Sequence, residues 1–169
     1  MKAEIRKEDL NSQKLSWLCI EPMLLSVRGQ SMEAKKEVYL RLIEGQQALY
    51  LFYSYHNHTK SLAEFYWFSA YNIIDLRSWS RIRKGMQFFD LNEIIDVLDD
   101  IEALITDGKK SEETWHEVSP TDLEHNPHLL QQTELLYAAY QQASQQAIMT
   151  MNEWVRQHQD LVLEVKEED

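Results

Sequence analysis

The stretch SLAEFYWFSAYNIIDLRSWSRIRKG, residues 61–85, decides the fold that this sequence predicts. Ser61, with Glu64 three residues later, forms a capping box in which the two side chains satisfy backbone amides at a helix start. No Gly or Pro follows before Gly85, and apolar side chains recur at helical spacing around most of the circumference. Because a helix of this kind is normally buried by neighbours on several sides, we expect one long central helix that ends near Gly85.

A second stretch, DLNEIIDVLDDIEALITDG, covers residues 90–108 and predicts an acidic helix that is antiparallel to the first. Asp90 and Glu93 form its capping box. One face of this helix is apolar, and the other carries acidic side chains without any Lys or Arg: Glu93, Asp96, Asp99, Asp100 and Glu102. Since the first helix ends in basic residues, we expect Arg81 or Arg83 to form ion pairs with the two capping carboxylates.

The composition favours long helices in a single domain. The 169 residues include only 4 Gly and 3 Pro, whereas typical usage is roughly 7% and 5%. The formal net charge of −11 argues against direct nucleic-acid binding, which needs a basic surface, and against docking to anionic membranes. One cysteine, a charged N-terminal segment and the lack of a long apolar run predict a cytoplasmic protein.

The segments before the central helix predict a strap and one more long helix. Residues 1–30 form the N-terminal strap, in which Pro22 favours two short pieces or an extended segment over a continuous helix. Residues 32–55 predict a long helix that contains Gly45. Gly costs about 1 kcal/mol relative to Ala in a helix interior, so a close crossing with another helix is the favoured explanation. A kink beside a ligand pocket is the alternative.

The segments after the acidic helix predict a short helix, a long helix and a tail. Pro120 marks a short extra helix, and residues 127–158 form the last long helix, with a Gln-rich polar side. Residues 160–169 are expected to be a frayed acidic tail, although their apolar residues would also suit a short strand. The fold class is therefore all-α. We expect an antiparallel bundle of about four long helices with an N-terminal strap, in one helical domain over residues 1–169.

No sequence motif indicates an enzyme. The chain lacks the G-x-S-x-G, P-loop and G-x-G-x-x-G patterns. Cys19 lies in an apolar segment, where a buried and inert thiol is expected. Adjacent carboxylates such as Asp99 and Asp100 lie on a predicted solvent face, where nothing would raise the pKa of either group for catalysis. The expectation leans towards a protein without catalytic residues or a cofactor.

Histidine provides one metal-binding alternative. A di-iron bundle needs two helical Glu-x-x-His pairs, and the sequence supplies only Glu113 to His116, in a predicted loop. His56 and His58 lie in the turn before the aromatic helix and, with a carboxylate, would bind a divalent ion such as zinc. Solvated turn histidines are the competing explanation.

The aromatic residues provide the leading functional hypothesis. The chain contains 5 Trp, 8 Tyr and 5 Phe, many of them near the turn between the predicted helix over residues 32–55 and the central helix. A bulky core explains most of them, but Tyr and Trp also dominate binding hot spots, and aromatics line apolar pockets. The candidate partner-binding residues combine aromatic and acidic side chains: Tyr66, Trp67, Tyr71, Asp96, Asp99 and Asp100.

Three functions remain open at this point. The leading one is a non-enzymatic protein-interaction or regulatory module that binds a protein partner or a second copy of itself as a homodimer. The alternative is a metal- or small-molecule-binding bundle, with or without enzymatic activity, at the turn that contains His56 and His58. The third is a DNA mimic, in which the acidic row of residues 93–102 imitates phosphates towards a basic protein.

Overall fold

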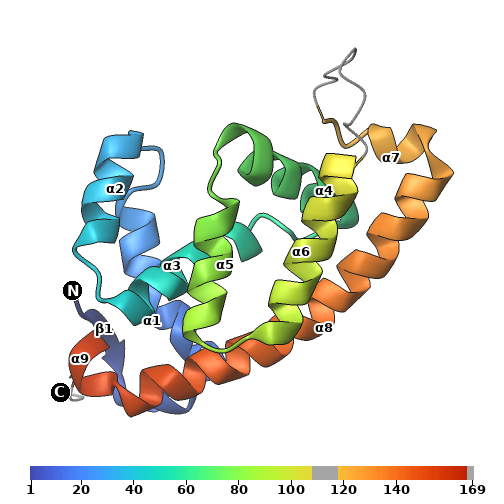
Figure 1. The fold of residues 1–169 in the computed structure, drawn as a ribbon. Coiled ribbons are helices and arrows are strands. Elements are labelled where there is room, and N and C mark those ends of the chain that lie inside the picture. Colours follow the sequence, from blue (N-terminus) through green and yellow to red (C-terminus); the bar gives the residue numbers. More distant parts are fainter. Residues whose placement is uncertain (108–117, 167–169) are drawn as a thin grey trace. The chain divides into compact units, whose positions relative to one another are not determined.

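The computed structural model of the chain describes residues 1–107 and 118–166. These residues are mostly helical, with nine α-helices and one two-stranded parallel sheet (Figure 1). The all-α class is therefore confirmed, apart from the small sheet. The arrangement as an antiparallel bundle of four long helices stays a prediction. In the part of the chain that the structure describes, no helix is long and apolar enough to cross a membrane.

The chain divides into two compact units. Unit 1 comprises Met1–Ser54 and Gln145–Asp169, and unit 2 comprises Tyr55–Ser144. Helices α3 (Glu44–His56) and α8 (Pro127–Gln157) contribute residues to both units. Unit 2 is therefore one contiguous segment, whereas unit 1 is assembled from the two ends of the sequence. The single domain expected from chain length stays a prediction.

In unit 1, the two ends of the sequence pair as parallel strands (Figure 1). The strand β1 (Ala3–Arg6) lies beside β2 (Leu163–Lys166), with Ala3 opposite Leu163. The expected frayed tail is wrong as far as Lys166, because the backbone of β2 pairs with β1 and its first side chain, Leu163, is buried. Residues 167–169 lie outside the described residues. A short 3-10 helix, η1 (Lys7–Asn11), follows β1, and the four-residue helix α9 (Gln159–Val162) precedes β2.

The helix α1 (Leu15–Ser26) runs without interruption through Pro22, so the expected division of this segment is wrong. A proline inside a helix costs roughly 3 kcal/mol. Pro22 is exposed, however, and α1 buries Cys19, Ile20 and Met23. Because each fully buried apolar side chain contributes about 1.5–3 kcal/mol, the burial of these side chains outweighs the lost hydrogen bond.

The predicted helix over residues 32–55 is two helices, α2 (Met32–Leu40) and α3. Ser31 caps α2 as expected, since its hydroxyl accepts a hydrogen bond from the Ala34 amide at 3.3 Å. The Gln47 side chain explains the break between the helices. Its Nε2 donates to the carbonyl oxygens of Tyr39 at 3.2 Å and Leu42 at 3.0 Å, which satisfies acceptors where α2 ends.

The long central helix predicted in unit 2 is divided into three parts. These are α4 (Leu62–Ala70), the π-helix η2 (Tyr71–Asp75) and α5 (Trp79–Phe88). The break follows η2, where the Asn72 side chain donates to the Phe68 carbonyl at 2.8 Å and accepts from the Ser78 hydroxyl at 2.7 Å. Arg77 then turns the chain with a φ of 48°. The expected stop at Gly85 is also wrong, because α5 continues through this residue.

The acidic helix of unit 2 is α6 (Asn92–Asp107). Asp90 does not cap it as predicted, because Asp90 lies two residues earlier with a φ of 54°. The short extra helix is confirmed as α7 (Asp122–His125), and the last long helix is confirmed as α8. Figure 1 shows α6 alongside the first half of α8 within this unit.

The core of unit 2 is built from aromatic rings. Tyr55 packs edge-to-face against Trp79 and Tyr140, with ring centroids at 5.3 and 5.7 Å. The Tyr55 hydroxyl hydrogen-bonds the Ser69 hydroxyl at 2.7 Å, and the Trp79 indole donates to the Leu98 carbonyl at 3.2 Å. The bulky core therefore accounts for much of the aromatic content.

Candidate interaction surfaces of unit 2

Four rings form an aromatic surface on unit 2, which consists of His58, Trp67, Phe68 and Tyr71. Trp67 is 40% exposed and stacks on Tyr71, with ring centroids 5.6 Å apart and planes inclined by 7°. Phe68 contacts Tyr71 at 5.9 Å and His58 at 4.6 Å between ring centroids. The Trp67–Tyr71 pair is thus a preformed stack that is partly open to solvent.

The local backbone explains why these two rings meet. Trp67 and Tyr71 are four residues apart at the end of α4, so they lie on one helix face. The π-helix begins at Tyr71, and Arg77 with its positive φ follows shortly afterwards. π-turns and residues in the left-handed region are frequent at functional sites. Both features point to this part of unit 2 as a candidate site.

Tyr66 does not belong to the aromatic surface, although the sequence placed it there. It is 5% exposed, and its hydroxyl donates to Asp122 Oδ2 at 3.3 Å. Burial, followed by the neighbouring Asp122 carboxylate, raises the pKa of Tyr66 to about 12. Its neighbour Trp67 points elsewhere because successive side chains on a helix diverge by about 100°. Tyr66 therefore holds α7 to α4 instead of facing a partner.

The acidic face of α6 is only partly open. Asp99 is paired with Arg83 of α5, with Nη2 to Oδ2 at 2.7 Å and Nε to Oδ1 at 2.5 Å. The predicted pairing of Arg81 or Arg83 with the capping carboxylates is wrong, because α5 extends beyond Gly85 and brings Arg83 opposite Asp99. Asp96 and Asp100 are exposed. Of the three candidate aspartates, these two remain solvent-facing.

His56 does not lie in a turn as predicted, because it is the last residue of α3, whereas His58 lies in the turn that follows. His56 Nδ1 lies 3.0 Å from the Tyr140 hydroxyl, which also lies 3.4 Å from the Thr59 hydroxyl. Burial, and then the charge of Lys60, lowers the pKa of His56 to about 4. The ring is therefore neutral at pH 7. His58 is exposed and packs on Phe68.

Over residues 1–107 and 118–166, which the structure describes, no group of three or more His, Cys, Asp or Glu side chains could hold a metal ion. Glu113 and His116 lie outside these residues. In unit 1, Cys19 is buried as expected, and burial raises the pKa of its thiol to about 12. This thiol is protonated and shielded at neutral pH, which is the inert state.

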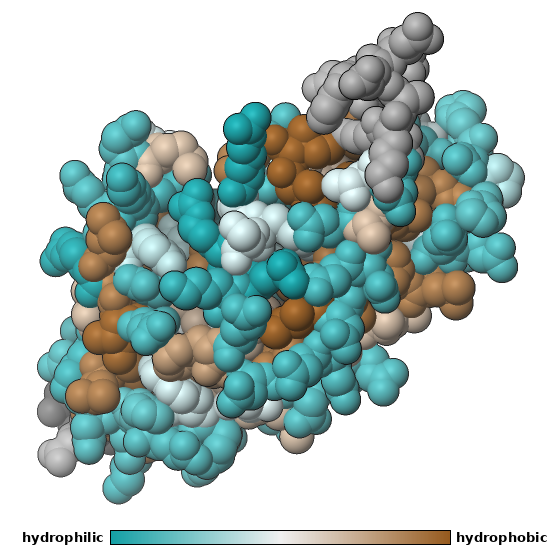
Figure 2. All heavy atoms as spheres, in the orientation of Figure 1, coloured by the Kyte–Doolittle hydropathy of each residue, from teal (hydrophilic) through white to brown (hydrophobic). Residues whose placement is uncertain are grey.

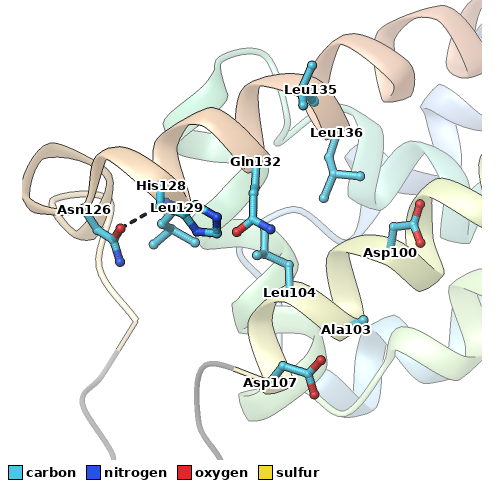
Figure 3. A pocket seen from close by; sticks show the side chains of 10 residues that line it. All are labelled: Asp100, Ala103, Leu104, Asp107, Asn126, His128, Leu129, Gln132, Leu135 and Leu136. Atoms are coloured by element: carbon cyan, nitrogen blue, oxygen red, sulfur yellow. Dashed lines mark hydrogen bonds between the residues drawn. The ribbon is translucent and has the colours of Figure 1, made fainter.

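A groove between α6 and α8 is the second candidate surface, and sequence analysis did not predict it. It has a volume of about 610 Å³, and Figure 3 shows its walls, the C-terminal half of α6 and the first turns of α8. We call it the α6–α8 groove. The side chains that line it come from these helices and from the residue before α8: Asp100, Ala103, Leu104, Asp107, Asn126, His128, Leu129, Gln132, Leu135 and Leu136.

The groove has an apolar floor and a polar rim. Leu104, Leu129 and Leu136 are half-buried, and Leu135 at the rim is 69% exposed. Figure 2 shows the corresponding brown, apolar surface over this part of α8 among teal, hydrophilic atoms. The Asn126 side chain fixes the start of α8, because its Oδ1 accepts from the Leu129 amide at 3.1 Å.

Comparisons with known proteins found no match for this chain among family models, curated proteins or solved structures.

Proposed function

We propose that this chain is a non-enzymatic protein-interaction module, and that the aromatic surface of unit 2 docks a protein partner. One observation carries this proposal, the stack of Trp67 on Tyr71 that is open to solvent. Trp and Tyr dominate the residues that contribute most to protein–protein binding. Because the two rings already hold each other in place, little side-chain entropy is lost when a partner covers them.

Charge indicates the kind of partner. The chain has a formal net charge of −11, and Asp96 and Asp100 of unit 2 face solvent. A partner with basic residues near its interface is attracted by this field, whereas a second copy is repelled unless it approaches through uncharged surface. A protein partner is thus favoured over a homodimer.

Two features support a non-enzymatic role. Cys19 is a buried thiol with a raised pKa, and His56 is a neutral ring held against Tyr140. Neither group is arranged as a nucleophile or general base beside an open site. These groups serve the packing of their units.

The metal-binding alternative has its own direct test. The Tyr140 hydroxyl is hydrogen-bonded to His56 Nδ1. This nitrogen would have to give up that hydrogen bond in order to bind zinc. Elemental mass spectrometry of purified, untagged protein with no added metal measures this directly. About one equivalent of zinc, iron or manganese, lost in a variant with both His56→Gln and His58→Gln, would replace the interaction proposal.

The DNA-mimic alternative needs a row of open carboxylates. Arg83 engages Asp99 in the middle of that row, which weakens the resemblance to a phosphate backbone. Replacing Asp96 and Asp100 with Lys tests this alternative. A partner that binds the doubly substituted chain as tightly as the wild type would exclude it.

The interaction proposal is tested by partner capture with matched variants. The test variant carries Trp67→Ala and Tyr71→Ala, and the control carries Leu40→Ala, which removes an exposed apolar side chain from unit 1. Loss of a hot-spot residue costs at least about 2 kcal/mol, or roughly 30-fold in affinity. We expect the double variant to lose its partner while circular dichroism shows an unchanged helix content, and the control to retain it.

Two results contradict the proposal. The first is equal recovery of the same partner by the wild type and the double variant. The second is a wild-type chain that sediments as a monomer at all concentrations and recovers no partner from any extract of its source cells.

A further inference from the structure

We infer that the α6–α8 groove is a docking site for a basic amphipathic helix of a partner protein. This inference rests on the proposed function for the class of partner, a protein. It uses a surface other than the Trp67–Tyr71 stack, so the two proposals can fail separately.

The shape of the groove suits a helix. Its walls are two helices that lie side by side, and its volume is about 610 Å³. Leu104 of α6 and Leu136 of α8 face this space in Figure 3. An amphipathic helix binds such a groove by placing apolar side chains at successive turns into it.

The apolar side chains of the groove are partly open to solvent. Leu135 at the rim is 69% exposed, whereas Thr133 and Tyr140 on the opposite side of α8 are buried. Leu104 and Leu129 are only half-buried. All three leucines line the groove, and contiguous exposed apolar surface commonly marks a binding site.

The charges at the groove select a basic partner. Among the described residues that line it are the carboxylates of Asp100 and Asp107, and none of these described residues is a Lys or Arg. The exposed Asp96 lies one helical turn before Asp100 on the same face of α6. A partner helix with Lys or Arg at one-turn spacing beside its apolar face would match Asp96 and Asp100.

The same charges disfavour other occupants. An anionic membrane or a second copy of this acidic chain would bring like charge towards Asp96 and Asp100. An uncharged small molecule would not be attracted by the charge of these carboxylates.

The probe is a synthetic peptide of Leu and Lys, about 15 residues long, with Leu on one helical face and a fluorescent label. Its matched control has Glu in place of every Lys. Fluorescence anisotropy measures the binding of both peptides to the full chain, and NMR chemical shifts locate the bound peptide. We expect the Lys peptide to bind, with affinity that falls at high salt, and the Glu peptide not to bind.

Three variants of the chain identify the site. Asp96→Asn with Asp100→Asn removes up to two exposed ion pairs of about 0–1 kcal/mol each, so we expect the affinity to fall by up to about 30-fold. Leu135→Ala with Leu104→Ala is expected to weaken binding at least as much and to leave the salt dependence unchanged. The control, Glu37→Gln with Asp160→Asn, removes the same charge from exposed positions of unit 1 and is expected to bind like the wild type.

Several outcomes overturn the inference. They are equal affinity for the Lys and Glu peptides, equal loss in the control and test charge variants, and shift changes away from Leu104, Leu129 and Leu135. Binding of the peptide by the wild type that survives both test variants overturns it as well. Binding that is unaffected by Trp67→Ala but lost in the groove variants supports the inference even if the aromatic surface has no partner.

Discussion

The indole of Trp154 in α8 occupies the space that a side chain at Gly45 in α3 would need. A Cβ atom added to Gly45 would overlap with the Cζ2 and Cη2 atoms of Trp154. The predicted close helix crossing at Gly45 is therefore confirmed within unit 1. The backbone of Gly45 has no positive φ, so its conformation does not require a glycine. The packing of the Trp154 indole requires it.

Gly45→Ala is expected to destabilise the chain. Alanine would add about 1 kcal/mol of helix propensity, but forcing the indole and backbone apart costs about 1–3 kcal/mol. We expect a net loss of up to about 2 kcal/mol in the free energy of unfolding, measured with urea. Gly45→Ala combined with Trp154→Ala is the control, since removal of the indole relieves the overlap. An increase in stability from Gly45→Ala alone would contradict this packing.

The stability of the chain is expected to depend on pH through His56. Its pKa is lowered from 6.5 to about 4 in the folded state, so between these values the unfolded state binds more protons. Stability therefore falls as the pH decreases from 6.5 towards 4, by at most about 3 kcal/mol for this group. NMR titration of the ring measures the folded pKa. Denaturation from pH 7 to pH 4.5 should show a smaller pH effect in His56→Gln than in the wild type, whereas the exposed His128→Gln should match the wild type.

The ion pair between Arg83 and Asp99 is expected to contribute little to stability. Both side chains are partly exposed, and exposed pairs contribute about 0–1 kcal/mol. Arg83→Ala should lower the free energy of unfolding by no more than about 1 kcal/mol, and by less at high salt. Arg81→Ala, an exposed residue on the same helix, is the control. A loss of several kcal/mol would indicate that the pair is much more strongly shielded from water.

The sheet of unit 1 is expected to depend on one side chain of β2. Leu163 is 3% exposed and Val165 is 39% exposed. Leu163→Ala should cost about 2–3 kcal/mol, because it removes buried methyl groups and leaves a cavity. Val165→Ala should cost less than about 0.5 kcal/mol, as is usual for a surface position. Thermal unfolding of both variants measures the difference, and equal effects would mean that β2 is not packed as described.

The sequence predicted helices well where local chemistry decides them. Ser61 caps α4 by accepting from the Glu64 amide at 3.3 Å, and Asn126 starts α8. These signals depend on residues three positions apart, so the sequence alone contains them. The Glu64 carboxylate accepts a hydrogen bond from the Lys60 amide. A capping box would have used the amide of Ser61, one residue later.

The break after η2 was not predicted because no Gly or Pro marks it. It depends instead on the side-chain bonds of Asn72 and the positive φ of Arg77. Asn72 and Ser78 are residue types that favour caps and turns, and their presence inside an apolar run is the signal that was available. In α1 the sequence predicted a break at Pro22 that does not occur. The helix continues through this residue because the burial of Cys19, Ile20 and Met23 stabilises it.

The candidate sites were predictable to different degrees. The Trp67–Tyr71 stack follows from a four-residue spacing, which sequence analysis detects. Tyr66, next to Trp67, has nearly the same local sequence environment, and only the packed structure shows that it points inwards. The α6–α8 groove was not predictable, because its walls come from segments on either side of residues 108–126 and no local pattern records which helices pair.

The contiguity of unit 2 has a consequence for biosynthesis. All residues of unit 2, Tyr55–Ser144, leave the ribosome before the β2 strand that completes the sheet of unit 1. Since domains and compact segments fold as they emerge, unit 2 can acquire its structure during translation. The β1 strand is made before unit 2, but its partner strand exists only after residues 163–166 have been made. A chaperone that acts on the nascent chain would therefore have most to protect at the N-terminal end.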